Sequence, residues 1–165
     1  KSKNLKILEP IFLDLHSATW NDLESYEFVK NAKMFECWER NVGAMIGLAT
    51  AVNYLSNLGT DAVENRIKQL SSSLTAGLSE FKDVTLLEKS IFHSGIITFT
   101  KSSVDATDLK DRLKKVNINI SVCKQKNARL DLGKECTGDV NRASLHYYNT
   151  EQEITRFLQE LKKLK

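Results

Sequence analysis

Two side chains near the C-terminal end could together bind a small polar ligand. Arg142 and His146 lie in residues 141–147, which are predicted as a strand, and alternate residues of a strand point to one side. A guanidinium presents a planar fork that pairs with a carboxylate through two charge-assisted hydrogen bonds. An imidazole on the same side could hydrogen-bond the ligand or donate a proton to it. The alternative is a structural salt bridge between Arg142 and a nearby acid, because such ion pairs are common.

The other residues with reactive side chains do not form a recognisable metal or disulfide pattern. Cys37, Cys123 and Cys136 are widely spaced and contain no C-x-x-C pair, so neither a zinc site nor a disulfide framework is predicted. His16 and His93 have no neighbouring ligand residues in the sequence. A reducing cytoplasm is the simplest location for such a chain.

Composition and charge exclude several classes of protein. The chain has 165 residues, with 24 Lys and Arg against 21 Asp and Glu, and this length predicts one domain, with or without a piece of another. Acids are interleaved with bases, as in LKDRLKK and LQELKKLK, which indicates solvated helix faces rather than a nucleic-acid surface. No apolar run approaches the roughly 20 residues of a membrane helix, so no membrane contact is predicted.

Two consecutive helices are predicted in the middle of the chain. The first carries an apolar stripe at spacings of three and four residues, and Gly59 ends it. The second is predicted to start at Asp61, with Glu64 completing a capping box. Both stripes predict core packing, and their members are Val42, Met45, Ala49, Val52 and Leu55, then Val63, Ile67, Leu70, Leu74, Leu78 and Phe81.

The remaining elements predict an α+β domain. Short apolar runs at 11–13 and 27–29 could be strands, and β-branched runs at 84–87, 96–99 and 118–122 are typical of strands. A helix is predicted over 105–115, and Thr150 with Glu153 predicts a capping box at the start of the last helix. From residue 60 the order is α-β-β-α-β-β-α, which predicts a mainly antiparallel sheet with helices on one face. The polar stretch 124–139 is predicted as a long loop, and such loops are often functional.

Five strings resemble one enzyme family. The string NRASLHYYNTEQEI is similar to the C-terminal end of class V aminotransferase-type enzymes, which use pyridoxal phosphate. AKMFECWERN, GLATAVNYLSNLGTDAVENRI, SGIITF and INISVCKQKNARLDL follow the same family in the same order. The family includes cysteine desulfurases, kynureninase-like lyases and isopenicillin N epimerase-like proteins. FECWE and ARLDL are most similar to the epimerase-like branch.

The resemblance implies a fold-type I enzyme of which this chain is the C-terminal region. Residues 1–58 would be the tail of the α/β large domain and the connecting helix, and residues 59–165 the small C-terminal domain. The cofactor lysine is not recognisable in the sequence, so the chain alone is expected to be inactive and to bind no pyridoxal phosphate covalently. The intact protein is expected to be a homodimer that acts on an amino acid.

The resemblance also implies roles for individual residues. Arg142 would bind the α-carboxylate of the amino acid, His146 could contact the substrate, and Arg129 of the ARLDL string would reach the active site when the small domain closes. An equally good interpretation of Arg129 is a loop anchor that pairs with Asp131. In desulfurases a threonine that binds the cofactor phosphate stands where this sequence has Glu39, and a carboxylate would repel phosphate.

Three questions stay open from the sequence. Arg40 or Asn41 could supply the phosphate donor that Glu39 cannot. A desulfurase needs a nucleophilic thiolate in the middle of the long loop, where this sequence has KQKNAR, so that reaction is disfavoured. The alternative to an enzyme is a non-catalytic interaction or dimerisation module of α+β fold.

Overall fold

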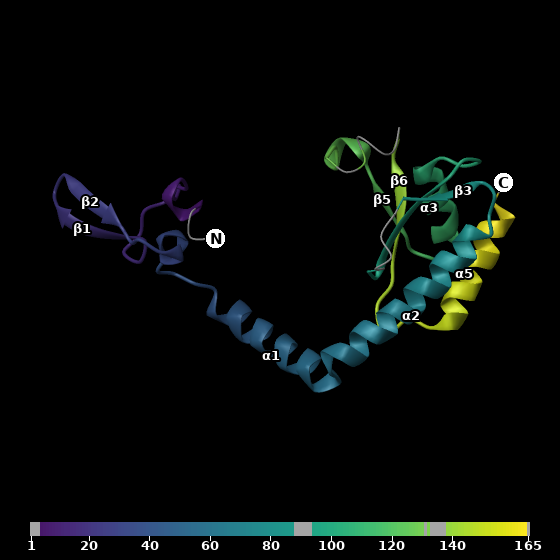
Figure 1. Cartoon of the computed structure of the whole chain (residues 1–165), viewed down its shortest axis with the longest axis horizontal. Coiled ribbons are helices and arrows are strands. Elements are labelled where there is room, and N and C mark those ends of the chain that lie inside the picture. Colours follow the sequence, from purple (N-terminus) through teal and green to yellow (C-terminus); the bar gives the residue numbers. More distant parts are fainter. Residues whose placement is uncertain (1–3, 88–93, 131, 133–137, 165) are drawn as a thin grey trace. The chain divides into compact units, whose positions relative to one another are not determined.

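A computed structural model describes residues 4–87, 94–130, 132 and 138–164 of the chain (Figure 1). The chain divides into two compact units, residues 1–54 and 55–165. Residues of each unit contact mainly other residues of the same unit. The predicted boundary between a large-domain remnant and a small domain, after residue 58, stays a prediction.

The first unit holds one small antiparallel sheet. Strand β1 (Ala18–Asp22) pairs with β2 (Ser25–Phe28), and two short 3-10 turns, η1 (Asn4–Lys6) and η2 (Ala32–Phe35), flank them. The strand predicted at 11–13 is wrong, because Ile11 and its neighbours form an exposed bend. The second strand lies near the predicted 27–29 but begins earlier. An apolar run of three residues is too short to distinguish a strand from a turn.

Helix α1 (Val42–Leu58) forms where its pattern predicts it, but it contributes nothing to a core of this chain. None of its residues is buried, and Ile46 and Leu48 are 63% and 67% exposed. The prediction that its stripe packs into a core is therefore wrong for the described residues. The helix contains no charged residue, so its apolar positions are not confined to one face.

The second unit confirms the predicted α+β fold and element order. Its elements are α2 (Thr60–Ser79), β3 (Val84–Leu86), β4 (Ile96–Lys101), α3 (Ala106–Lys115), β5 (Ser121–Cys123), η3 (Gln125–Asn127), β6 (Val140–Ser144) and α5 (Glu151–Lys163). The four strands lie in the order β3-β4-β6-β5, and every pairing is antiparallel. Strand β6 is therefore an inner strand with a partner on each side.

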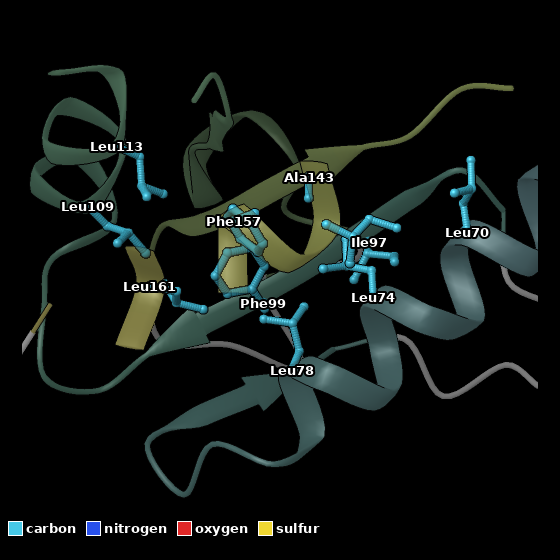
Figure 2. Close-up of a cluster of buried hydrophobic side chains, with 11 residues drawn as sticks. Leu70, Leu74, Leu78, Ile97, Phe99, Leu109, Leu113, Ala143, Phe157 and Leu161 are labelled. Carbon is cyan, nitrogen blue, oxygen red and sulfur yellow. The ribbon is translucent and has the colours of Figure 1, made fainter. Parts of the chain in front are cut away.

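Helices α2, α3 and α5 of this unit contribute to one core on one face of the sheet. Leu74 and Leu78 of α2 point toward Ile97 and Phe99 of β4 (Figure 2), and Leu70 of the same helix belongs to this core. Helix α3 contributes Leu109 and Leu113, helix α5 contributes Ile154, Phe157 and Leu161, and β6 contributes Ala143. The rings of Phe99 and Phe157 meet edge to face with centroids 6.1 Å apart, a favourable geometry for aromatic pairs.

Local signals explain where the helices begin. Thr150 and Glu153 form the predicted capping box of α5, and Asp105 caps α3 through the amides of Thr107 and Asp108. Helix α2 starts one residue before Asp61, so the predicted capping box there is wrong. Gly59 instead precedes the helix with φ of 85°, a left-handed angle that glycine adopts without strain.

The start of β4 and the end of β6 approach each other closely at Gly95. The carbonyl of Gly95 accepts a hydrogen bond from the Leu145 amide at 2.6 Å. A Cβ at residue 95 would collide with the carbonyl oxygen of Leu145. Glycine is therefore needed here to let the two strands meet.

Candidate functional site

Arg142 lies on the face of the sheet opposite the helices. Its neighbours in β6, Asn141 and Ala143, point to the helix side, where the Asn141 amide donates to the Ala106 carbonyl of α3. Because side chains alternate along a strand, Arg142 must point to the other side. The alternation of side chains along the strand predicts that Arg142 and Ala143 lie on opposite faces. The structure shows that the helices cover the face of Ala143.

The guanidinium of Arg142 has no acidic partner within the described part of the chain. It forms no ion pair or hydrogen bond there, and its Nε is buried without a partner. A buried donor that has lost its water and gained no acceptor is destabilising by about 1–3 kcal/mol. The alternative of a structural salt bridge is thus not seen among these residues.

Short hydroxyl side chains surround Arg142 on this open face. Thr98 of β4 and Ser121 of β5 stand directly opposite it, one on each side. By the strand registers, the same face also carries Thr85, Ile96, Thr100, Cys123, Val140 and Ser144. Val140 is fully buried, so this face is covered at that position. No member of this set is acidic. Sequence reasoning missed Thr98 and Ser121, because cross-strand register depends on pairing between distant segments.

The prediction that His146 lies in the strand over 141–147 is wrong. Strand β6 ends at Ser144, and the His146 amide donates to the Asn149 side chain at 2.8 Å in the turn that follows. The imidazole stacks on Tyr148 and contacts Tyr147, with centroids 4.9 and 4.5 Å away. His146 therefore belongs to an aromatic cluster, and its role toward a substrate stays a prediction.

The turn that carries His146 is fixed to α2 by an arginine. Arg66 donates through both terminal nitrogens to the Glu151 carboxylate, at 2.5 and 3.1 Å, and also to the Asn149 carbonyl at 3.0 Å. The hydrogen bonds from Arg66 lower the pKa of Glu151 to about 2. Bidentate pairing of this kind sets geometry as well as energy.

The long loop is described in part. Arg129 is exposed in the turn after η3 and has no partner among the described residues, whereas Asp131 lies outside them, so the proposed Arg129–Asp131 anchor is not visible. Cys123 is half-buried at the end of β5, paired with Val140. Cys136 lies outside the described residues.

Arg40 and Asn41 belong to the first unit, and both have partners there. Arg40 forms an ion pair with Glu36, and the Asn41 side-chain oxygen caps α1 by accepting the Ala44 amide at 2.9 Å. Their role in binding a phosphate stays a prediction. In the described part of this unit, the Arg40 guanidinium is paired with the Glu36 carboxylate, and the Asn41 carboxamide oxygen is used by the helix cap.

One hollow of the second unit lies beside its core, and Arg142 does not line it. It has a volume of about 420 Å³ and lies on the helix side, since Ala143, Leu74 and Phe157 line it together with Ile118 and Arg156. Among the described residues, no group of three or more His, Cys, Asp or Glu side chains could hold a metal. No described helix is long and apolar enough to span a membrane.

Comparison with known proteins defines the class to which this fold belongs. The Aminotransferase class-V family matches residues 1–157, and the chain belongs to that family. A probable cysteine desulfurase of Pyrococcus abyssi is 26% identical over 144 residues, which are 87% of this chain and 36% of the relative. The chain thus spans little more than a third of that relative.

Solved structures show that the fold is that of fold-type I pyridoxal-phosphate enzymes. The apo cysteine desulfurase of Thermococcus onnurineus NA1 superposes with a TM-score of 0.82 at 24% identity, over 98% of this chain and 40% of that one. A cystine C–S lyase in complex with cysteine persulfide gives 0.71 at 21% identity, over 99% and 41%. The fold prediction is confirmed, while the preference for the epimerase-like branch stays a prediction.

Pyridoxal phosphate is the cofactor of this family, and another structure of the same lyase holds it covalently linked to glycine. The described residues of this chain do not by themselves fit that cofactor. Arg40 is already paired with Glu36, and the carboxylate of Glu39 precedes it. The role of Arg142 toward a substrate carboxylate stays a prediction.

Proposed function

We propose that the chain supplies the substrate-carboxylate site of a pyridoxal-phosphate enzyme that acts on an amino acid. The observation that supports this is Arg142, which lies on the sheet face away from the helices, with a buried Nε that has no partner and no acid beside it among the described residues. A planar fork held on an inner strand is positioned more rigidly than one on a loop. In this role Arg142 binds both carboxylate oxygens and fixes the orientation of the bonds at the substrate Cα.

We propose lyase chemistry as the reaction outcome, because the relatives are named desulfurases and a C–S lyase. The described start of the long loop carries Lys124, Lys126 and Asn127 but no thiol, and Cys123 is on a strand. Residues 124–130, where a thiol nucleophile would be expected, contain no cysteine. The proposed lyase therefore breaks a bond of its substrate without a nucleophile from this segment.

The carboxylate site is testable on the 165-residue chain itself. The ¹⁵Nε–H resonance of Arg142 should shift saturably in NMR spectra when L-alanine is added, because a carboxylate supplies the missing acceptor. L-Alaninamide, which lacks the carboxylate, should not shift it. Arg142→Met should abolish alanine binding, and Arg112→Met, at an exposed arginine of α3 paired with Asp108, should keep it. If Arg142→Met bound L-alanine as tightly as the unaltered chain, the proposed function would be refuted.

We further propose that this chain alone has no lyase activity, since no cofactor lysine is recognisable in its sequence. Purified chain incubated with pyridoxal phosphate and L-cystine should release no pyruvate, and it should show no stable imine absorbance. Pyruvate released in proportion to the concentration of the chain would contradict this.

We also propose that the protein is a homodimer. The support is α1, whose apolar side chains are exposed throughout the helix, and such patches commonly bind other protein surface. Sedimentation of the chain should show a dimer that Ile46→Asp with Leu48→Asp weakens. A purely monomeric parent chain at high concentration would contradict the proposal. A cytoplasmic location stays a prediction.

A further inference from the structure

We infer that Ser121 is a second substrate-binding residue, whose hydroxyl donates to the carboxylate held by Arg142. The inference rests on the proposed function of Arg142 and deepens it. It starts from the strand register, in which Ser121 of β5 stands directly opposite Arg142 of β6. Residues opposite each other in an antiparallel pair have Cβ atoms roughly 4.5–5.5 Å apart and share one face of the sheet.

The buried Nε of Arg142 determines from which side a carboxylate must approach. A guanidinium can bind a carboxylate through its two terminal nitrogens or, side-on, through Nε and one terminal nitrogen. Only the side-on arrangement satisfies the Nε that has no partner now, and because this Nε is buried, the carboxylate must displace the groups that cover it. Since Nε is the guanidinium nitrogen nearest the backbone, a carboxylate bound side-on lies close to the sheet, within reach of short side chains on the neighbouring strands.

Ser121 has the chemistry and the freedom to complete such a site. A carboxylate has about four lone-pair positions, and the guanidinium fork occupies two of them. The hydroxyl of Ser121 is exposed and forms no hydrogen bond within the described residues, so it can donate to a third position. Thr98 stands on the other side of Arg142, but it is half-buried and already takes part in another interaction. The geometry therefore favours Ser121 over Thr98.

The test compares hydroxyl variants at matched positions on the same sheet face. Thr85 of β3 is an exposed hydroxyl residue on the other edge strand of that face and is not adjacent to Arg142 in the sheet order. The dissociation constant for L-alanine is measured by NMR titration of the 165-residue chain. Ser121→Ala should weaken binding about tenfold, because a hydrogen bond to a charged group is lost. Ser121→Thr, which keeps the hydroxyl, should restore most of the affinity, and Thr85→Ala should leave it unchanged.

The outcomes separate this inference from the proposed function. If Ser121→Ala binds L-alanine as tightly as the parent while Arg142→Met does not bind, the inference is wrong and the function stands. If Arg142→Met also binds, both are wrong. Equal losses in Ser121→Ala and Ser121→Thr would likewise overturn the inference, because the hydroxyl would then not be the cause. The backbone amide spectrum without ligand reports whether each variant, Arg142→Met included, keeps the native fold.

Discussion

The two faces of the four-stranded sheet differ in almost every physical respect, although the same strands build both. The helix-covered face presents Ile97, Phe99 and Ala143 to a core that excludes water. The open face presents Thr98, Ser121 and Arg142, with one buried donor left unsatisfied. Residues 142 and 143 are adjacent in sequence and lie on opposite faces. Because side chains alternate along a strand, one face of the sheet stabilises the fold and the other carries the candidate binding residues. A substitution on one face should therefore have little effect on the property of the other.

The largest expected effect is on the covered face. Phe99→Ala should lower the free energy of unfolding by about 3–5 kcal/mol, because it removes a fully buried ring and leaves a cavity against Phe157. Thr85→Ala on the open face should change it by no more than about 0.5 kcal/mol. Denaturant titration followed by far-UV circular dichroism measures both, since Trp20 and Trp38 belong to the first unit. Similar losses from the two variants would remove the distinction between the faces.

A smaller effect is expected where the two ends of the inner strands meet. Gly95→Ala should cost about 1–3 kcal/mol, because the new Cβ collides with the backbone carbonyl of Leu145, which cannot rotate away. Gly77→Ala in α2 is the control. Its Cβ meets only the end of the Leu158 side chain, and alanine gains about 1 kcal/mol of helix propensity over glycine. Thermal denaturation should therefore rank Gly95→Ala as the less stable variant, and the reverse order would contradict the close approach.

On the open face, removing the candidate binding residue should not destabilise the fold. Arg142→Met keeps the apolar part of the side chain and removes the unsatisfied Nε, so the free energy of unfolding should stay unchanged or rise by up to about 1 kcal/mol. Chemical denaturation without ligand measures this. A loss of more than 1 kcal/mol would indicate that Arg142 stabilises the fold, and the comparison between the faces would then fail.

The weakest expected effect concerns acid stability at the turn after β6. The pKa of Glu151 is about 2 in the folded chain against 4.5 as its ordinary value, because Arg66 hydrogen-bonds its carboxylate. A lowered pKa means that this pair stabilises the fold above pH 4.5 and that its contribution is lost as pH falls toward 2. Glu151→Gln should therefore reduce the slope of stability against pH within that window. An unchanged slope in denaturation series between pH 5 and 2.5 would show that the pair is too solvated to matter.

Elements with local signals could be predicted from the sequence. Helix α5 begins at the Thr150–Glu153 capping box, and α3 at its Asp105 cap, because capping depends only on residues within one turn. The alternation of Arg142 and Ala143 across the sheet was also predictable, since it follows from strand geometry alone. These are the parts of the fold and the site that needed no knowledge of distant segments.

Features that depend on tertiary contacts could not be predicted. Strand β5 covers 121–123 instead of the predicted 118–122, and Ile118 and Ile120 pack against the core before it begins. The stripe of α1 predicted a helix but not its exposure. Ser121 and Thr98 escaped notice as neighbours of Arg142, because only the register of three strands brings them together. A helical or alternating pattern specifies an element, whereas its surroundings come from the rest of the fold.

The inner position of β6 has a consequence for how long the site survives under stress. Both edges of this strand are hydrogen-bonded, so its amides can exchange with solvent only when the neighbouring strands separate as well. Fraying at the sheet margins would not release Arg142. Heating should therefore abolish ligand recognition in the same cooperative step that melts the unit, with no earlier loosened form.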